Sequence, residues 1–242
     1  MKKEIEELKA LINDSNNIVF FGGAGVSTES NIPDFRSKDG LYSRKFDLPP
    51  ERILSHSFFT EYPDKYFEVH LDRLGHINAA APNKAHLKLA ELEAAGKLKA
   101  VVTQNIDNLH HKAGSKNVFE LHGSAVRNYC IKCRKKYPVC YVLNSGKIPR
   151  CECGGIVRPD IVMFEEALNE DTVAKAIEYI SRADVLIVGG TSLVVYPAAG
   201  FINCYRGKKL VLINQSETSF DEKADLVIRD SIGEALGQVG FV

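Results

Sequence analysis

Polar side chains follow two short apolar segments of the chain, at positions suited to act on a bound substrate. The first segment leads into Gln104, Asn105 and Asp107, and the second ends in His122. Open α/β sheets bind ligands beyond the carboxyl ends of their strands, so we expect these four side chains to meet at one sheet edge. A histidine there can exchange a proton near neutral pH, and a purely structural histidine before a turn is the commoner alternative.

Five of the six cysteines lie within one short window. Cys130-x-x-Cys133 is followed after seventeen residues by Cys151-x-Cys153. Two close pairs of thiolates match a tetrahedral zinc site, and the crowding favours a metal over disulfides in a chain without an export signal. The second pair is one residue shorter than the usual spacing. Cys140 lies between the pairs and is an alternative ligand.

A zinc ion held by four thiolates has no open position for water, so we expect it to stabilise a small ribbon and not to take part in chemistry. Basic residues dominate the stretch 126–155, where Glu152 is the single acid. We interpret them as a solvated face. An acidic partner or nucleic acid is the alternative.

A glycine-rich turn follows the first apolar segment. Residues 18–21 have the length and composition of a buried strand, and three glycines occupy the next stretch, 22–25. Glycine lets a backbone turn sharply and lets a ligand approach closely. We expect Val26 to Ser30 to open a helix whose free N–H groups face a phosphate, with the hydroxyls of Ser27 and Thr28 as further donors.

This glycine pattern is an incomplete dinucleotide fingerprint. Thr28 stands at the position of the third glycine, and no acidic ribose partner follows at the expected distance. A hydride-transferring dehydrogenase is therefore disfavoured. A tight turn without a ligand is the alternative for the glycines alone.

Apolar segments alternate with helical ones, which is typical of a doubly wound parallel sheet. The predicted strands are 18–21, 99–103, 118–121, 184–188, 210–213 and 225–229. The predicted helices are 2–14, 84–95, 170–181 and 232–238. Residues 37–95 carry no strand pattern, and we expect a loop followed by short helices whose aromatic residues form a local core. The predicted fold class is α/β, a Rossmann-like doubly wound parallel sheet with a small zinc-ribbon domain and a helical insertion.

Composition and charge are those of an ordinary globular protein. The chain has 242 residues, 31 basic and 31 acidic side chains, and a formal net charge of zero. The overall charge therefore gives no reason to expect binding to a membrane or to a specific nucleic-acid sequence. The sequence contains no signal-peptide pattern and no apolar segment long enough to span a bilayer, so we expect a cytoplasmic protein.

The motifs together closely resemble those of the sirtuins, the NAD-dependent protein deacylases, in a short single-module form of bacterial or archaeal type. Matching runs follow one another in order along most of the chain. They are Gly23-Ala24-Gly25-Val26-Ser27, Ile32-Pro33-Asp34-Phe35-Arg36, Thr103-Gln104-Asn105-Ile106-Asp107, Leu121-His122-Gly123, the two cysteine pairs, Arg158-Pro159-Asp160-Ile161-Val162, Gly190-Thr191-Ser192 through Pro197, and Ile213-Asn214.

The resemblance implies a role for each matched position. It implies that His122 is the general base and that Asn105 and Asp107 act with it. NAD would be bound by Ala24, Gly25, Thr28, Phe35, Arg36, Gln104, Asn105, Ile106, Asp107, His122, Thr191, Ser192, Asn214 and Ile232. The acyl-lysine peptide would lie against Val162, Met163, Phe164, Val194 and Val195. Zinc would be bound by Cys130, Cys133, Cys151 and Cys153.

The implied reaction consumes NAD as a co-substrate. The acyl oxygen of a protein lysine attacks the nicotinamide ribose, nicotinamide leaves, and the acyl group passes to ADP-ribose. The products are free lysine, nicotinamide and O-acyl-ADP-ribose. Protein mono-ADP-ribosylation, which shares the first step, and a non-catalytic zinc-ribbon or nucleotide-binding module are the alternatives.

Two features depart from patterns within the family. Where many members have F-G-E, this chain has Phe164-Glu165-Glu166, so the peptide loop lacks a glycine. The stretch 63–73 has no Tyr-x-x-Arg, the pair used by members specialised for acidic acyl groups. We therefore expect acetyl or another uncharged acyl-lysine as substrate.

The resemblance also suggests how the chain is divided. The expected NAD-binding domain comprises residues 1–36, 97–125 and 156–242. The cofactor-binding loop and helical insertion would span 37–96, and the zinc ribbon 126–155.

Overall fold

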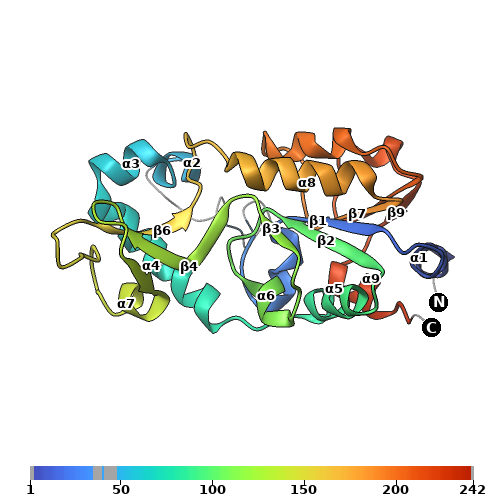
Figure 1. Cartoon of the computed structure of the whole chain (residues 1–242), viewed down its shortest axis with the longest axis horizontal. Coiled ribbons are helices and arrows are strands. Elements are labelled where there is room, and N and C mark those ends of the chain that lie inside the picture. Colours follow the sequence, from blue (N-terminus) through green and yellow to red (C-terminus); the bar gives the residue numbers. More distant parts are fainter. Residues whose placement is uncertain (1–2, 35–39, 41–47, 241–242) are drawn as a thin grey trace.

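The computed structural model describes residues 3–34, 40 and 48–240 and contains two sheets. The larger sheet has six strands, all parallel, in the order β3-β2-β1-β7-β8-β9 (Figure 1). These strands are β1 (Ile18–Gly22), β2 (Leu98–Thr103), β3 (Val118–Glu120), β7 (Val185–Gly189), β8 (Lys209–Ile213) and β9 (Leu226–Ile228).

The order in which successive strands are added to this sheet reverses beside β1. From β1, the strands β2 and β3 follow toward one edge of the sheet. The strands β7, β8 and β9 follow toward the other edge. At the carboxyl end of the sheet, Gly22 is level with Thr103 of β2 and with Gly189 of β7. Loops from these strands therefore leave the sheet side by side, at the switch point where doubly wound sheets bind ligands.

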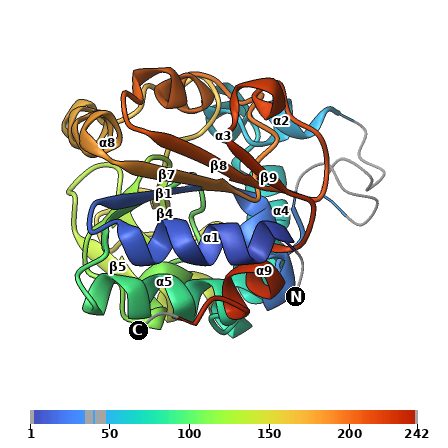
Figure 2. The same ribbon diagram turned by 90° about the vertical axis from the view of Figure 1, so that its right-hand side faces the viewer.

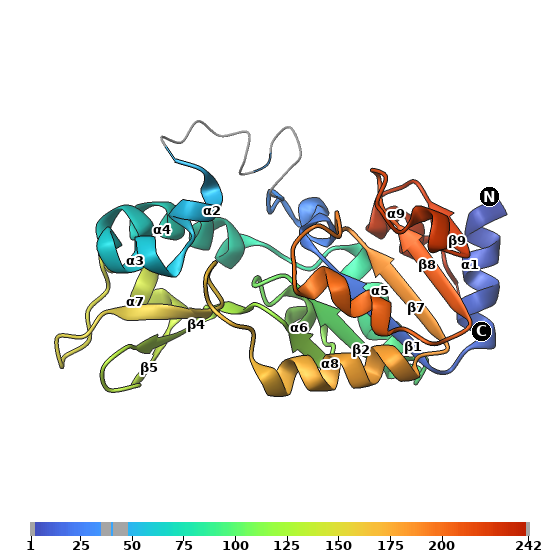
Figure 3. The same cartoon turned by 90° about the horizontal axis from the view of Figure 1, so that it is seen from above.

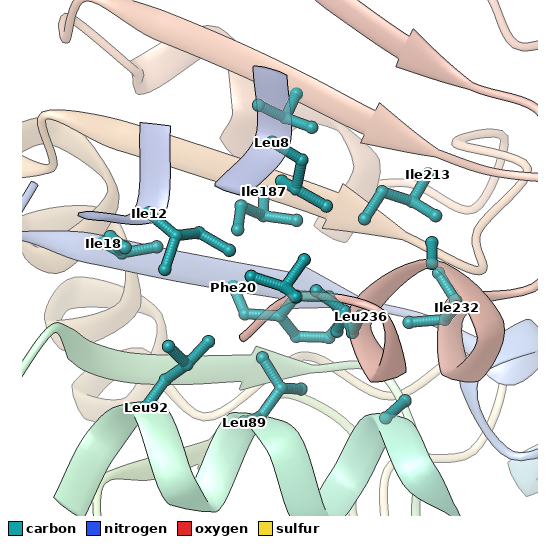
Figure 4. Packing of buried hydrophobic residues seen from close by; sticks show 14 of the residues in the cluster. Leu8, Ile12, Ile18, Phe20, Leu89, Leu92, Ile187, Ile213, Ile232 and Leu236 are labelled. Carbon is teal, nitrogen blue, oxygen red and sulfur yellow. The ribbon is translucent and has the colours of Figure 1, made fainter. Parts of the chain in front are cut away.

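Helices cover both faces of the large sheet. Figure 2 shows α1 (Lys3–Asp14), α5 (Lys84–Ala94) and α9 (Ile232–Gly237) on one face, and α8 (Glu170–Arg182) on the other. The central strand β1 is buried along its whole length because its side chains alternate between two cores. Phe20 packs with Leu8, Ile12 and Leu89 on the first face (Figure 4). Phe21 packs with residues of α8 on the second.

A smaller lobe lies beside the large sheet (Figures 1 and 3). Its three-stranded antiparallel sheet has the order β5-β4-β6. The elements of this lobe are α2 (Pro50–Ile53), α3 (His56–Glu61), α4 (Pro63–Ala79), β4 (Gly123–Cys130), β5 (Lys136–Pro138), α7 (Val139–Leu143) and β6 (Val157–Ile161). Leu74 and Ile77 of α4 pack against the small sheet and α7. The predicted domain boundaries stay a prediction, and the small sheet itself spans Gly123 to Ile161.

The predicted fold class is confirmed, and each predicted strand and helix differs from the observed element by at most one residue at either end. Two local expectations were wrong. Val26 to Ser30 do not open an α-helix. Two 3₁₀ turns, Ala24–Val26 and Thr28–Ser30, occur there and end at Asn31, which has a φ of 60°. Glycine, serine and threonine are weak helix formers, so nothing in this stretch extends the turns.

The second wrong expectation concerns the helical segment before α5. Although α2 and α3 are short, α4 has 17 residues. Its buried residues Tyr66, Phe67, His70, Leu74 and Ile77 recur at helical spacing and form one continuous face toward the other elements of the small lobe. Among the described residues, no helix is long and apolar enough to cross a membrane.

Candidate active site

A cavity of about 470 Å³ lies at the carboxyl ends of the central strands, between the large sheet and the small lobe. Loops after β1, β2, β6, β7 and β8 contribute to its wall. The predicted site residues that line it are Ala24, Gly25, Thr28, Gln104, Asn105, Ile106, Asp107, His122, Val162, Met163, Phe164, Thr191, Ser192, Val195, Asn214 and Ile232.

The remaining predicted residues are placed differently. Val194 is 53% exposed and is not among the residues of the cavity wall. Phe35 and Arg36 lie outside the described residues. The wall also includes Tyr66 and Arg73 of α4, which the sequence did not assign to the site. The aromatic spacing of α4 signalled only a buried face, and Tyr66 does pack edge-on against Phe67.

The glycines after β1 allow two loops to touch. The Gly25 N–H donates to the Gly190 carbonyl at 2.8 Å. A Cβ atom at Gly25 would lie 2.8 Å from the Gly190 Cα, closer than such atoms approach in proteins. Gly190 itself has a φ of 59°, a left-handed conformation that glycine adopts without strain. The turns after β1 and β7 therefore form one continuous floor for the cavity.

A buried hydrogen-bond network joins the turn after β1 to the loop after β2. The Ser27 hydroxyl, which we had expected to face a phosphate, donates to Asp107 Oδ2 at 2.7 Å. Asn105 Nδ2 donates to Ser27 Oγ at 3.0 Å, and the Leu109 N–H donates to Asp107 Oδ1 at 2.9 Å. Asp107 is only 4% exposed. Its carboxylate is therefore fixed on both oxygens, and Ser27 is a structural member of the site that residue type alone did not reveal.

His122 is held in one orientation and one tautomer. Its Nδ1 lies 2.9 Å from the Gln104 carbonyl oxygen. A carbonyl oxygen only accepts, so Nδ1 carries the hydrogen and Nε2 keeps a free lone pair. Burial lowers the pKa of the His122 imidazole below its ordinary value, against a smaller upward effect of the Gln104 hydrogen bond. The ring is therefore neutral at neutral pH and can accept a proton at Nε2.

The side chain of Gln104, whose backbone carbonyl oxygen orients His122, is fixed by a hydrogen bond of its own. Its side-chain Nε2 donates to Thr191 Oγ1 at 3.1 Å. This bond links the loops after β2 and β7, which flank β1 on opposite sides. The His122 carbonyl accepts from the Val162 N–H at 2.9 Å, so the same histidine also fixes the start of the loop after β6.

Four cysteines form a compact group in the small lobe. The sulfur atoms of Cys130, Cys133, Cys151 and Cys153 all lie within 4.8 Å of one another. Tetrahedral zinc with Zn–S bonds of about 2.3 Å needs sulfur–sulfur separations of about 3.8 Å, so the group fits the ion. Cys140, the alternative ligand, lies on α7 and is not a member. The shortened Cys151-x-Cys153 pair thus still places both of its sulfur atoms in the group.

The zinc site is separate from the cavity. The cavity wall contains none of the four cysteines, which supports a structural role for the ion. The Tyr137 hydroxyl donates to Cys151 Sγ at 3.0 Å, and this bond is the largest of several hydrogen bonds that lower the pKa of the thiol to about 6. This contact favours the thiolate form that binds a metal.

Comparison with known proteins gives a consistent result. A model of the Sir2 family matches residues 23–197. An NAD-dependent protein deacetylase of Clostridium perfringens is 59% identical over 99% of either chain. A protein of the same name from Clostridium tetani is 57% identical over 97% of this chain and 96% of its own.

Solved structures of Sir2 proteins share the fold. One, which holds a p53 peptide and NAD⁺, superposes with a TM-score of 0.87 at 42% identity, over 99% of this chain and 97% of its own. Another holds a deacetylated p53 peptide and 3′-O-acetyl-ADP-ribose. It has a TM-score of 0.90 at 40% identity, over 98% of this chain and 96% of its own.

Proposed function

Because this chain belongs to the Sir2 family and is an NAD-dependent protein deacetylase, we propose that His122 is its general base. NAD is consumed as a co-substrate and supplies the ribose that receives the acyl group. In the proposed role, His122 Nε2 removes a proton from a ribose hydroxyl, so that the sugar oxygen attacks the acyl carbon.

The hydrogen bond between His122 Nδ1 and the Gln104 carbonyl carries this proposal. It leaves Nε2 as the basic atom and fixes the plane of the ring. The lowered pKa keeps the ring unprotonated at neutral pH, which is the form a base needs. A positioned base of this kind contributes about 10²- to 10⁴-fold in rate.

We propose that the loops after β1, β2, β7 and β8 bind NAD. The fused turns at Gly25 and Gly190 offer a close backbone approach for the pyrophosphate. The fixed Asn105 and Asp107 side chains suit the nicotinamide ribose, because their positions are set before the ligand arrives. Thr191, Ser192, Asn214 and Ile232 would contact the adenosine half. Phe35 and Arg36 stay predictions.

We propose that the acyl-lysine peptide lies against the loop after β6. Val162, Met163 and Phe164 of this loop line the cavity together with Val195, and Val194 lies exposed beside it. Phe164 is itself exposed, which suits contact with an extended peptide.

We further propose that the acyl group is uncharged. His70 of α4 is buried, and burial lowers the pKa of its imidazole to about 3, so it offers no positive charge to an acid. Arg73, which lines the cavity, is the cation that would favour the opposite outcome.

The His122→Ala variant tests the proposed base. We expect deacetylation of an acetyl-lysine peptide to fall at least 100-fold, on the order of the contribution of a general base. Exchange of free nicotinamide into NAD should fall less, because nicotinamide leaves before the base acts. Zinc content and the unfolding temperature should match the parent chain.

His76→Ala is the matched control, since His76 is exposed on α4 and lies outside the cavity wall. Deacetylation by this control should stay at the parent rate. Near-normal turnover by His122→Ala would remove His122 from the role of base.

A further inference from the structure

Glu165 adopts a backbone conformation that favours glycine. Its φ is 76°, in the left-handed region, and it is one of five non-glycine residues with positive φ among those described. It stands where many sirtuins have glycine in the F-G-E run. The chain therefore keeps the conformation of that loop without the residue that adopts it most easily.

The Glu165 side chain makes contacts that a glycine lacks. Ser57 of α3 donates to it twice, from its backbone N–H to Oε2 at 2.9 Å and from its hydroxyl to Oε1 at 2.9 Å. The Ser57 N–H belongs to the first turn of α3 and has no acceptor within the helix. Both carboxylate oxygens are thus used, and these hydrogen bonds lower the pKa of Glu165.

The backbone beside Glu165 continues the same attachment. The His56 N–H donates to the Phe164 carbonyl at 3.0 Å, and the Phe164 N–H donates to the Leu54 carbonyl at 3.2 Å. Residues 54–56 and Phe164 therefore run alongside each other like paired strands. The loop after β6 is joined here to a helical segment roughly 100 residues earlier in the chain.

The next residue, Glu166, attaches the loop on its other side. Its carboxylate accepts from both terminal nitrogens of Arg158 in β6, at 2.6 and 2.9 Å, and from the Met163 N–H at 2.8 Å. Glu166 therefore ties the loop to its own strand, and its Oε1 also lies 2.8 Å from Nδ1 of His56 in α3, whereas Glu165 is bonded to Ser57 of α3. The distance between the loop and the helical segment is therefore set jointly by the Glu165 carboxylate, the two backbone hydrogen bonds of Phe164 and the Glu166–His56 contact.

The attached loop forms one wall of the cavity. Residues 161–166 line it, together with Leu54 and Tyr66 of the helical segment. His122 is bonded to the start of the loop through Val162. A shift of the loop relative to α3 would therefore change the shape of this part of the cavity wall.

We propose that Glu165 is a positioning residue that fixes the loop Val162–Glu166 against α3 and so sets the geometry of the acyl-lysine peptide site. The proposal rests on the proposed function, in which the peptide binds along this loop. It predicts that the Ser57–Glu165 contact affects the peptide and not NAD, since NAD would be held by loops of the large sheet.

Four variants test the proposal: E165A, E165G, E165Q and S57A. E165A loses the contact with Ser57 and keeps a side chain at a positive φ, whereas E165G loses the contact and adopts the same φ without strain. Comparison of the two variants therefore separates loss of the contact from backbone strain. We expect E165A and E165G to raise the KM for an acetyl-lysine peptide about tenfold, which corresponds to one lost hydrogen bond to a charged group. S57A keeps one of the two bonds, and E165Q can keep both without the charge, so each should raise it about threefold. The KM for NAD should stay within about twofold in all four, on the same scale.

Hydrogen exchange gives a second readout that is independent of turnover. The amide hydrogens of His56 and Phe164 should exchange faster in E165G than in the parent chain, because the segment opens more often. E178A is the matched control, since Glu178 pairs with Arg182 on the exposed face of α8. It should change neither KM nor the exchange at His56 and Phe164.

The possible results are distinct. If the parent protein does not deacetylate the peptide, the proposed function itself is wrong. An active parent chain with an unchanged peptide KM in E165G would overturn the positioning role. A parallel rise in the KM for NAD, with a lower unfolding temperature, would also overturn it and show a merely structural contact.

Discussion

Acid should destabilise this fold at a pH where carboxylates scarcely titrate, and His86 provides the clearest case. His86 is completely buried in the first turn of α5, and its ring lies 4.7 Å from that of His110. Its Nε2 has no hydrogen-bond partner in the part of the chain that the structure describes. Burial lowers the pKa of the imidazole to about 4, against a smaller upward effect of Asp107.

The sign of the effect follows from proton binding. Between the folded pKa of about 4 and the unfolded pKa of 6.5, the unfolded chain binds a proton at His86 that the folded chain does not. The free energy of unfolding therefore falls as the pH falls through this window. Lowering the pH from about 7 to about 5 should cost about 2 kcal/mol at this one residue. His70, whose pKa is lowered to about 3, adds a loss of similar size.

The substitution His86→Gln isolates this term. His86 accepts from the Asn83 N–H as part of a capping box, and glutamine fills the same position in such boxes. We expect the variant to match the parent near pH 7 and to lose about 2 kcal/mol less near pH 5, by urea unfolding followed by circular dichroism.

Comparison of the His86→Gln variant with the parent protein cancels the contributions to stability that both share, such as loss of zinc at low pH. His76→Gln is the control, because this exposed ring is in water before and after unfolding. It should lose as much stability as the parent chain. An identical loss in His86→Gln and the parent chain would refute the reasoning.

The zinc site and the acyl group provide the remaining predictions. Cys140→Ser should keep one zinc per chain by metal analysis, whereas Cys153→Ser should lose it and lower the unfolding temperature, because only Cys153 belongs to the four-sulfur group. Zinc loss in Cys140→Ser would contradict that ligand set. A succinyl-lysine peptide should be turned over more slowly than its acetyl counterpart. Equal or faster turnover, abolished by Arg73→Ala, would show that Arg73 binds the acidic group.

The strands were predictable because parallel strands are buried on both faces and therefore appear as short, continuous apolar runs. Residues 18–21 and 185–188 are of this kind. The order of the strands depends on contacts between residues far apart in the chain, so the sequence predicted a doubly wound sheet but not its strand order. The length of α4 was missed because the prolines spread over residues 49–82 suggested interruptions, whereas Pro63 stands at the start of the helix and Pro82 follows its end.

The site was predictable where a residue follows a buried strand, as Asn105 and Asp107 do. It was not predictable where two residues meet across the fold. Ser27 and Asp107 are 80 positions apart, and their hydrogen bond requires the touching turns after β1 and β7 and the register of β1 with β2. Glu165 and Ser57 are 108 positions apart. The only sign of their pairing in the sequence is a glutamate where many sirtuins have glycine.

The fate of the acetyl group tests the central claim most directly. A peptide carrying labelled acetyl-lysine would be incubated with NAD and the parent chain, and the labelled products would be separated. Acyl transfer predicts that the label passes to O-acetyl-ADP-ribose, in an amount equal to the nicotinamide and free lysine formed. Label in free acetate from the first turnover, or deacetylation without NAD loss, would contradict the account.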